Sequence, residues 1–166
     1  MNFPNTFPFD TLLWLVPFFF MLHNMEEAPM MVKWSERLPA RIKLLESRRQ
    51  FILAVTILTV ISFLLTYLGL KGLSEHAGHI LILAMLMTMT FNAFFPHVLL
   101  VLWFRMYNPG LVTALFLILP FSIYIFQRAL NENLLARNEF WLLLGLAPLI
   151  MIVSIFSSLK LGKLFS

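Results

Sequence analysis

The sequence contains no cysteine and few charged residues, and each shortage excludes a class of protein. Without cysteine the chain can form no disulfide, no thiolate metal site and no cysteine nucleophile. Charged residues make up 12% of the chain, whereas soluble domains carry about 25%. Hydrophobic residues make up 60%, and the mean hydropathy is +0.87. The composition therefore predicts an all-α membrane protein rather than a soluble domain.

The N-terminus, Met1-Asn2-Phe3-Pro4, also lacks the positively charged region that begins a cleavable signal peptide. We therefore expect the first hydrophobic stretch to stay in the protein. The length of 166 residues suits a single transmembrane domain over residues 1–166, without a separate soluble module.

Five stretches are long enough to span a bilayer, which takes about 20 apolar residues. They lie near residues 11–32, 51–70, 80–104, 111–130 and 140–159. The sequence thus predicts a five-transmembrane-helix bundle with short connections, apart from a basic loop at residues 33–50. Within this loop, Ser35–Gln50 fits an amphipathic surface helix or a solvated loop equally well, because it contains Pro39 and charges of both signs.

The distribution of Lys and Arg predicts the orientation, because positively charged loops stay in the cytoplasm. One side would carry the loop 33–50, Arg105, Lys160 and Lys163, and the other Lys71, Arg128 and Arg137. The N-terminus is therefore predicted outside and the C-terminus in the cytoplasm. The net charge of +4 follows mostly from this one loop, so it implies no nucleic-acid partner.

The first predicted span contains three ionisable residues, His23, Glu26 and Glu27. Helical spacing places the imidazole and both carboxylates on one face. Ionisable groups at membrane depth are costly and need a cation, a partner or a proton. The alternative is a wet interfacial turn that pairs with Lys33 or Arg37.

The third predicted span contains Asn92 and His97 at a matching depth. His97 lies about 10 Å before the cytoplasmic end of its span, and Glu26 lies about 9 Å before the end of the first span, at 1.5 Å per residue. Polar groups in a membrane bundle point inward. We therefore expect one shared site in the cytoplasmic half of the bundle.

Two histidines and two glutamates are suitable ligands for a divalent transition metal. Imidazole and carboxylate suit zinc, iron or manganese, and helical bundles build metal sites from inward-facing His and Glu residues. The sequence predicts His23, Glu26, Glu27 and His97 as metal ligands, with Glu26 and Glu27 as candidate catalytic residues.

Prolines lie beside both halves of the predicted site. Each interior proline frees the carbonyl four residues earlier, so Pro29 frees that of Met25 and Pro96 that of Asn92. Asn92 and His97 are five residues apart and would diverge on an ideal helix. A kink or π-bulge at Pro96 would bring them together, with Asn92 orienting a ligand or binding substrate. The alternative for Asn92 is a plain interhelical hydrogen bond.

Three short motifs together resemble a known family. His23-Asn24-Met25-Glu26-Glu27, the separate histidine His97, and Tyr107-Asn108-Pro109-Gly110 occur in the order found in the HXXEE integral-membrane domain family. The resemblance implies a bacterial membrane protein, with the inner membrane as its location, and implies no particular activity. Asn-Pro-Gly also favours a tight turn with glycine at positive φ, which we expect at the cytoplasmic face. Tyr107 would line the cavity mouth there or act as an interfacial anchor.

The leading functional hypothesis is a membrane-embedded metal-dependent enzyme, of hydrolase or oxidase type, that acts on a lipidic or hydrophobic substrate. A metal-free variant would shuttle a proton between a glutamate and a histidine. Two further alternatives remain open. One is an ion- or proton-coupled transporter or metal-handling protein that uses the same residues, and the other is a non-catalytic accessory subunit. The substrate, the metal and the oligomeric state do not follow from the sequence.

Overall fold

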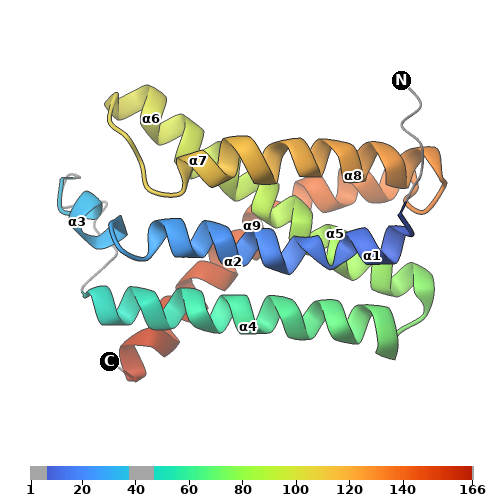
Figure 1. The fold of residues 1–166 in the computed structure, drawn as a ribbon, viewed down its shortest axis with the longest axis horizontal. Coiled ribbons are helices and arrows are strands. Elements are labelled where there is room, and N and C mark those ends of the chain that lie inside the picture. Colours follow the sequence, from blue (N-terminus) through green and yellow to red (C-terminus); the bar gives the residue numbers. More distant parts are fainter. Residues whose placement is uncertain (1–6, 38–46, 166) are drawn as a thin grey trace.

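The computed structural model describes residues 7–37 and 47–165, which form helices and turns without a β-strand. The helices are α1 (Phe9–Leu13), α2 (Leu15–Glu27), α3 (Met31–Ser35), α4 (Arg48–Gly72), α5 (Glu75–Asn92), the π-helix η2 (Ala93–Val98), α6 (Leu99–Phe104), α7 (Leu111–Thr113), the π-helix η3 (Ala114–Ile118), α8 (Leu119–Asn131) and α9 (Arg137–Leu164). They form an elongated bundle (Figure 1).

Four helical stretches of the described chain are long and apolar enough to cross a membrane. They are Arg48–Gly72, Glu75–Phe104, Leu111–Asn131 and Arg137–Leu164. The second joins α5, η2 and α6, and the third joins α7, η3 and α8. The chain is therefore a multi-pass helical membrane protein, and these four stretches contain the last four predicted spans.

The first predicted span, residues 11–32, is not one continuous helix. It is divided into α1 and α2 by a break at Trp14, and α2 ends at Glu27. The break follows from Pro17, which has no N–H for the carbonyl of Leu13 and whose ring clashes with that carbonyl. The helix α2 still runs beside α4 (Figure 1). A fifth membrane crossing here, and the orientation of the bundle, stay predictions.

The loop predicted at residues 33–50 is shorter than expected at both ends. The helix α3 extends to Ser35, and α4 already begins at Arg48. The choice between a surface helix and a solvated loop falls mostly on residues 38–46, which lie outside the described residues.

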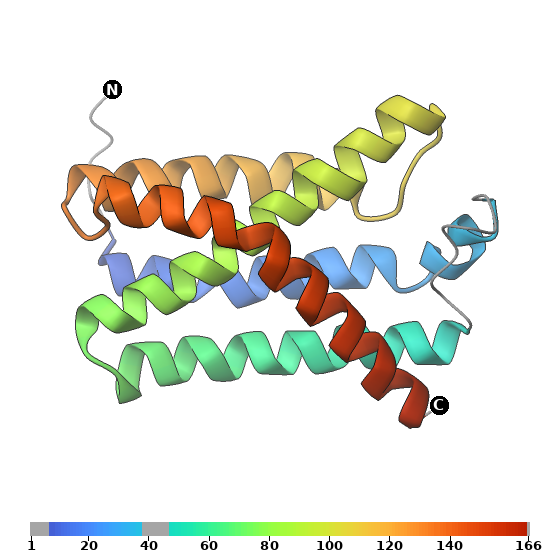
Figure 2. The same ribbon diagram turned by 180° about the vertical axis from the view of Figure 1, so that it is seen from behind.

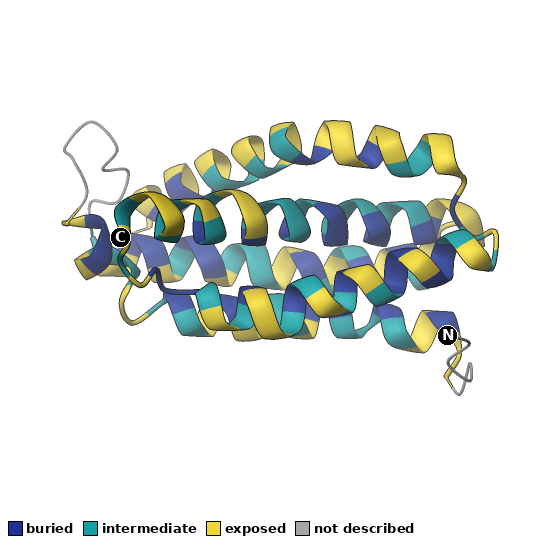
Figure 3. Ribbon diagram, turned by 90° about the horizontal axis from the view of Figure 1, so that it is seen from above, coloured by how far each residue is buried: buried dark blue, intermediate teal, exposed yellow. Residues whose placement is uncertain are grey.

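The helices pack around a hydrophobic core. Its most buried members include Leu13, Val16, Ile82, Leu86 and Ile125. The long helix α9 crosses α4 and α5 on the other side of the bundle (Figure 2). Exposed residues line the outer faces of the helices (Figure 3). Many of them are large and hydrophobic, as expected for a surface in contact with lipid.

Candidate metal centre

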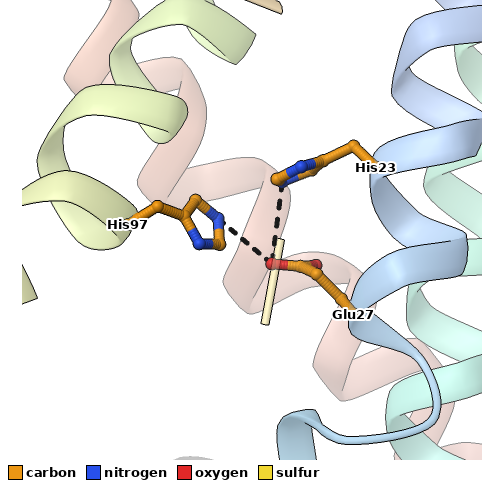
Figure 4. Close-up of side chains that lie close together, drawn as sticks. All are labelled: His23, Glu27 and His97. Atoms are coloured by element: carbon orange, nitrogen blue, oxygen red, sulfur yellow. Dashed lines mark ion pairs between the residues drawn. The ribbon is translucent and has the colours of Figure 1, made fainter. Parts of the chain in front are cut away.

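Three buried ionisable side chains from two helices meet inside the bundle (Figure 4). Glu27 Oε1 lies 3.1 Å from His97 Nε2 and 3.7 Å from His23 Nε2. One ligand atom from each residue lies within 4.8 Å of the others. The exposed fractions are 1% for His23, 8% for Glu27 and 2% for His97. A group of this size and chemistry can hold one metal ion.

The helix α2 presents two of the three side chains on one face. His23 and Glu27 are four residues apart, the spacing that places side chains one above the other on a helix. The same helix is fixed to α4 by Asn24, whose Nδ2 donates to Thr59 Oγ1 at 2.8 Å and to the Val55 carbonyl at 3.4 Å. This attachment sets the rotation of α2 and therefore the direction of His23 and Glu27.

The π-helix η2 presents the third side chain. Residues Ala93–Val98 form this π-helix around Pro96, as the sequence predicted in proposing a kink or π-bulge there. A π turn brings residues five apart onto the same face, and such turns occur frequently at functional sites. Asn92 Nδ2 lies 3.4 Å from His97 Nε2 and 3.5 Å from His23 Nε2. The amide therefore contacts both imidazoles, and its contact with His23 joins α5 to α2.

The Tyr-Asn-Pro-Gly segment closes the site from a third direction. The N–H of Leu111 donates to the Asn108 carbonyl at 3.1 Å, and Gly110 has φ +91°. This is the predicted tight turn with glycine at positive φ. Asn108, Pro109 and Gly110 are buried, and Gly110 lies against the ionisable group. The place of the turn at the cytoplasmic face stays a prediction.

Gly110 makes the closest approach to the site. A Cβ atom at this position would lie 2.7 Å from His97 Cε1, 2.8 Å from His23 Cε1 and 3.0 Å from Glu27 Cγ. Only glycine leaves room for the backbone here. This contact assigns a physical role to the last residue of the motif, which the sequence identified only by resemblance and turn chemistry.

Glu26 lies outside this compact group and turns toward α7. Its Oε2 accepts hydrogen bonds from the Thr113 N–H at 2.8 Å and hydroxyl at 2.6 Å. Its Oε1 accepts from the Val112 N–H at 3.2 Å and the Tyr107 hydroxyl at 2.6 Å. The carboxylate therefore binds the N-terminus of the α7–α8 helical stretch, where free N–H groups and the helix dipole favour an anion.

The two adjacent glutamates thus have different surroundings. Glu26 is compensated by the N-terminus of another helix. Glu27 ends α2, where the helix dipole disfavours an anion, and its polar contacts within the described chain are the two histidines. Neither carboxylate contacts Lys33 or Arg37 in the described residues, so the interfacial-turn alternative loses its expected partners.

Tyr107, for which the sequence left open a place at the cavity mouth or a role as an interfacial anchor, is half exposed and contacts Glu26. Partial burial, followed by the hydrogen bond and negative charge of Glu26, raises the pKa of Tyr107 to about 12. Because the folded pKa lies above the ordinary value of about 10, the stabilising contact is fully present below about pH 10 and is lost as the pH rises toward 12.

This contact can be measured by alkaline titration. Tyrosinate absorbance of the wild type minus that of Tyr107→Phe isolates Tyr107 from Tyr67 and Tyr124. We expect the difference to titrate near 12. A difference that titrates near the ordinary value would mean that the hydroxyl does not bind Glu26.

Two further residues at the site escaped the sequence analysis. Thr113 Oγ1 lies 2.9 Å from His23 Nδ1. Asn108 is 1% exposed and donates to the Pro96 carbonyl at 3.4 Å. A threonine in a hydrophobic helix carries no particular signal, and Asn108 looked like a turn residue only.

The fold and the cluster define a multi-pass helical membrane protein with a buried His–Glu–His group. The family model described as "Protein of unknown function with HXXEE motif" matches residues 14–125, and the chain belongs to this family. The chain is also similar to the uncharacterized protein YrkK of Bacillus subtilis (strain 168), with 28% identity over 131 residues, or 77% of this chain and 82% of that protein. No solved structure matches the chain.

Proposed function

We propose that the protein is a membrane-embedded metal-dependent enzyme, with His23, Glu27 and His97 as the ligands of one divalent transition metal. The observation that carries this proposal is the convergence of three buried ligand atoms within 4.8 Å of one another. Two imidazoles and one carboxylate suit zinc, iron or manganese. Three protein ligands also leave a coordination position open, which is typical of catalytic rather than structural sites.

The electrostatics of Glu27 support a bound cation. This carboxylate is buried at the C-terminal end of α2, where both desolvation and the helix dipole disfavour a negative charge. A metal ion would balance the charge, whereas neutral histidines would not. The backbone of Gly110 packs against both imidazoles and covers them on the side of the turn. This close packing supports the same proposal.

The surroundings of the site favour a hydrophobic substrate from the bilayer. Phe94 and Phe95 are 61% and 52% exposed on η2, three and two residues before His97, respectively. Beside the proposed metal ligands, His97 Nδ1 and Asn108 Oδ1 are buried and have no hydrogen-bond partner within the described chain. Such atoms can bind polar groups of a ligand. A lipidic molecule with a polar reacting group matches this combination.

The proposed roles of the residues follow from their contacts. His23, Glu27 and His97 would hold the metal. Asn92 Nδ2 lies against the Nε2 atoms of both histidines, so a bound metal would displace this amide from their lone pairs, and Asn92 is proposed to contact the substrate. The bound metal would act as a Lewis acid in a hydrolytic or oxidative reaction. Glu26 is proposed to support the site through its hydrogen bonds to the turn and to α7. The site lies in the cytoplasmic half of a bacterial inner-membrane protein in the predicted orientation.

Metal analysis of the purified protein tests the proposal. We expect near-stoichiometric zinc, iron or manganese in the wild type, and a loss of affinity of more than about 100-fold in His23→Ala, His97→Ala and Glu27→Gln, because each removes one of three ligands. His76→Ala is the matched control, since His76 is exposed and contacts Glu139. A wild type without metal under metal-replete conditions would overturn the proposal.

A second measurement separates an enzyme centre from the alternatives. Cobalt(II) in place of the native metal gives an absorption spectrum that changes when azide enters an open coordination position. An unchanged spectrum would indicate a closed structural site. Metal flux into proteoliposomes that is lost in Glu27→Gln would favour the transporter instead.

A further inference from the structure

A chain of hydrogen bonds connects Glu26 to His23 through Thr113. Glu26 accepts four hydrogen bonds on its two oxygens, and two of them come from the N–H groups of Val112 and Thr113, which can only donate. An ionised carboxylate has no hydrogen to donate. Glu26 therefore also accepts the hydrogen of the Thr113 hydroxyl.

The Thr113 hydroxyl has one hydrogen and two candidate acceptors. Glu26 Oε2 lies 2.6 Å from Thr113 Oγ1, whereas the Gly110 carbonyl lies 3.2 Å away. The shorter bond to the charged oxygen is the stronger one. Thr113 Oγ1 is therefore left as an acceptor on its other side, where His23 Nδ1 lies 2.9 Å away.

We propose that Thr113 is a positioning residue that holds the hydrogen of His23 on Nδ1. A neutral imidazole carries one hydrogen, so the lone pair of Nε2 then faces Glu27 and His97. Thr113 thereby sets the tautomer and the ring orientation that a metal ligand requires. The link to metal affinity rests on the proposed function, whereas the tautomer itself does not.

The local fold explains why Thr113 can reach both partners. The buried turn at Gly110 starts α7 beside His23, and Thr113 is the last residue of this short helix before η3. Its N–H and hydroxyl both bind the same oxygen of Glu26. Two hydrogen bonds to Glu26 therefore fix Thr113, and the free lone pairs of its hydroxyl oxygen face His23.

Nitrogen-15 NMR of the metal-free protein, in detergent micelles at about pH 8, where an ordinary histidine is neutral, tests the tautomer directly. Protonated and unprotonated ring nitrogens differ in chemical shift, and the His23 signals are identified by their loss in His23→Gln. We expect Nδ1–H in the wild type and in Thr113→Ser, which keeps the hydroxyl. In Thr113→Val, which keeps the shape but not the hydroxyl, we expect an increased share of Nε2–H.

Zinc titration of the same variants tests the consequence. We expect affinity to fall by about 10- to 100-fold in Thr113→Val, the usual effect of removing a group that orients a metal ligand, and to stay near the wild-type value in Thr113→Ser. Thr88→Val is the control, because this hydroxyl donates to the Ala84 carbonyl on α5.

Two results would overturn the role of Thr113. One is a Thr113→Val protein that keeps the wild-type tautomer, and the other is an equal loss of affinity in Thr113→Val and Thr88→Val. If the wild type binds no zinc, the proposed metal centre fails, and the NMR measurement on the metal-free protein still decides whether Thr113 sets the tautomer.

Discussion

Replacing Gly110 with alanine is expected to abolish metal binding by the His23, Glu27 and His97 group. The added Cβ would lie 2.7 Å from His97 Cε1 and 2.8 Å from His23 Cε1, closer than carbon atoms pack. Both imidazoles would have to move. The positive φ of 91° adds strain of about 1–2 kcal/mol for a residue with a side chain. Zinc titration should show a loss of affinity of more than about 100-fold, because two ligands are displaced at once.

Two variants distinguish this local clash from a general effect. Gly145→Ala adds a Cβ that meets nothing within 4 Å, and alanine in a helix interior is favoured over glycine by about 1 kcal/mol. This variant should keep its metal and its stability. Gly110→Asn tolerates positive φ better than alanine but has the same Cβ, so it should lose the metal too. Retained binding in Gly110→Asn would show that strain, not the contact, is responsible.

The two halves of the site were predictable from the sequence, because ionisable residues are rare within membrane spans. His23 and Glu27 are ionisable residues in a hydrophobic stretch, and His97 lies at a matching depth beside a proline. The π-helix was also predictable, since Pro96 removes the N–H that an α-helix would use at that point. These signals depend on the type of residue and on its distance along the chain from the end of a span, and both can be read from the sequence.

Other parts of the site depend on how distant segments pack, and the sequence carries no comparable signal for them. Glu26 and Glu27 differ in their contacts because the N-terminus of α7 lies beside Glu26 and not beside Glu27. The buried position of Gly110 depends on the path of the chain after Phe104. Thr113 acquires partners only through that path.

The second large expected effect concerns Pro96, which links the sequence to the position of His97. Alanine at this position restores an N–H that can bond to the Asn92 carbonyl, and an α-helical turn then becomes available. On an α-helix, side chains five residues apart lie on different faces. We therefore expect η2 to shift toward α-helix in Pro96→Ala and to turn His97 away from Asn92 and Glu27. The zinc affinity should fall toward that of His97→Ala, a loss of more than about 100-fold.

The matched control is Pro148→Ala, because Pro148 lies inside α9, where the helix continues without a π turn. This variant should bind zinc like the wild type. Thermal unfolding should show that both proline variants remain folded, which separates a displaced ligand from a lost bundle. Wild-type affinity in Pro96→Ala would mean that packing alone, including the hydrogen bond from Asn108 to the carbonyl of residue 96, maintains the π-helix. Proline would then favour the π-helix without being required for it, and the position of His97 would be a property of the whole bundle.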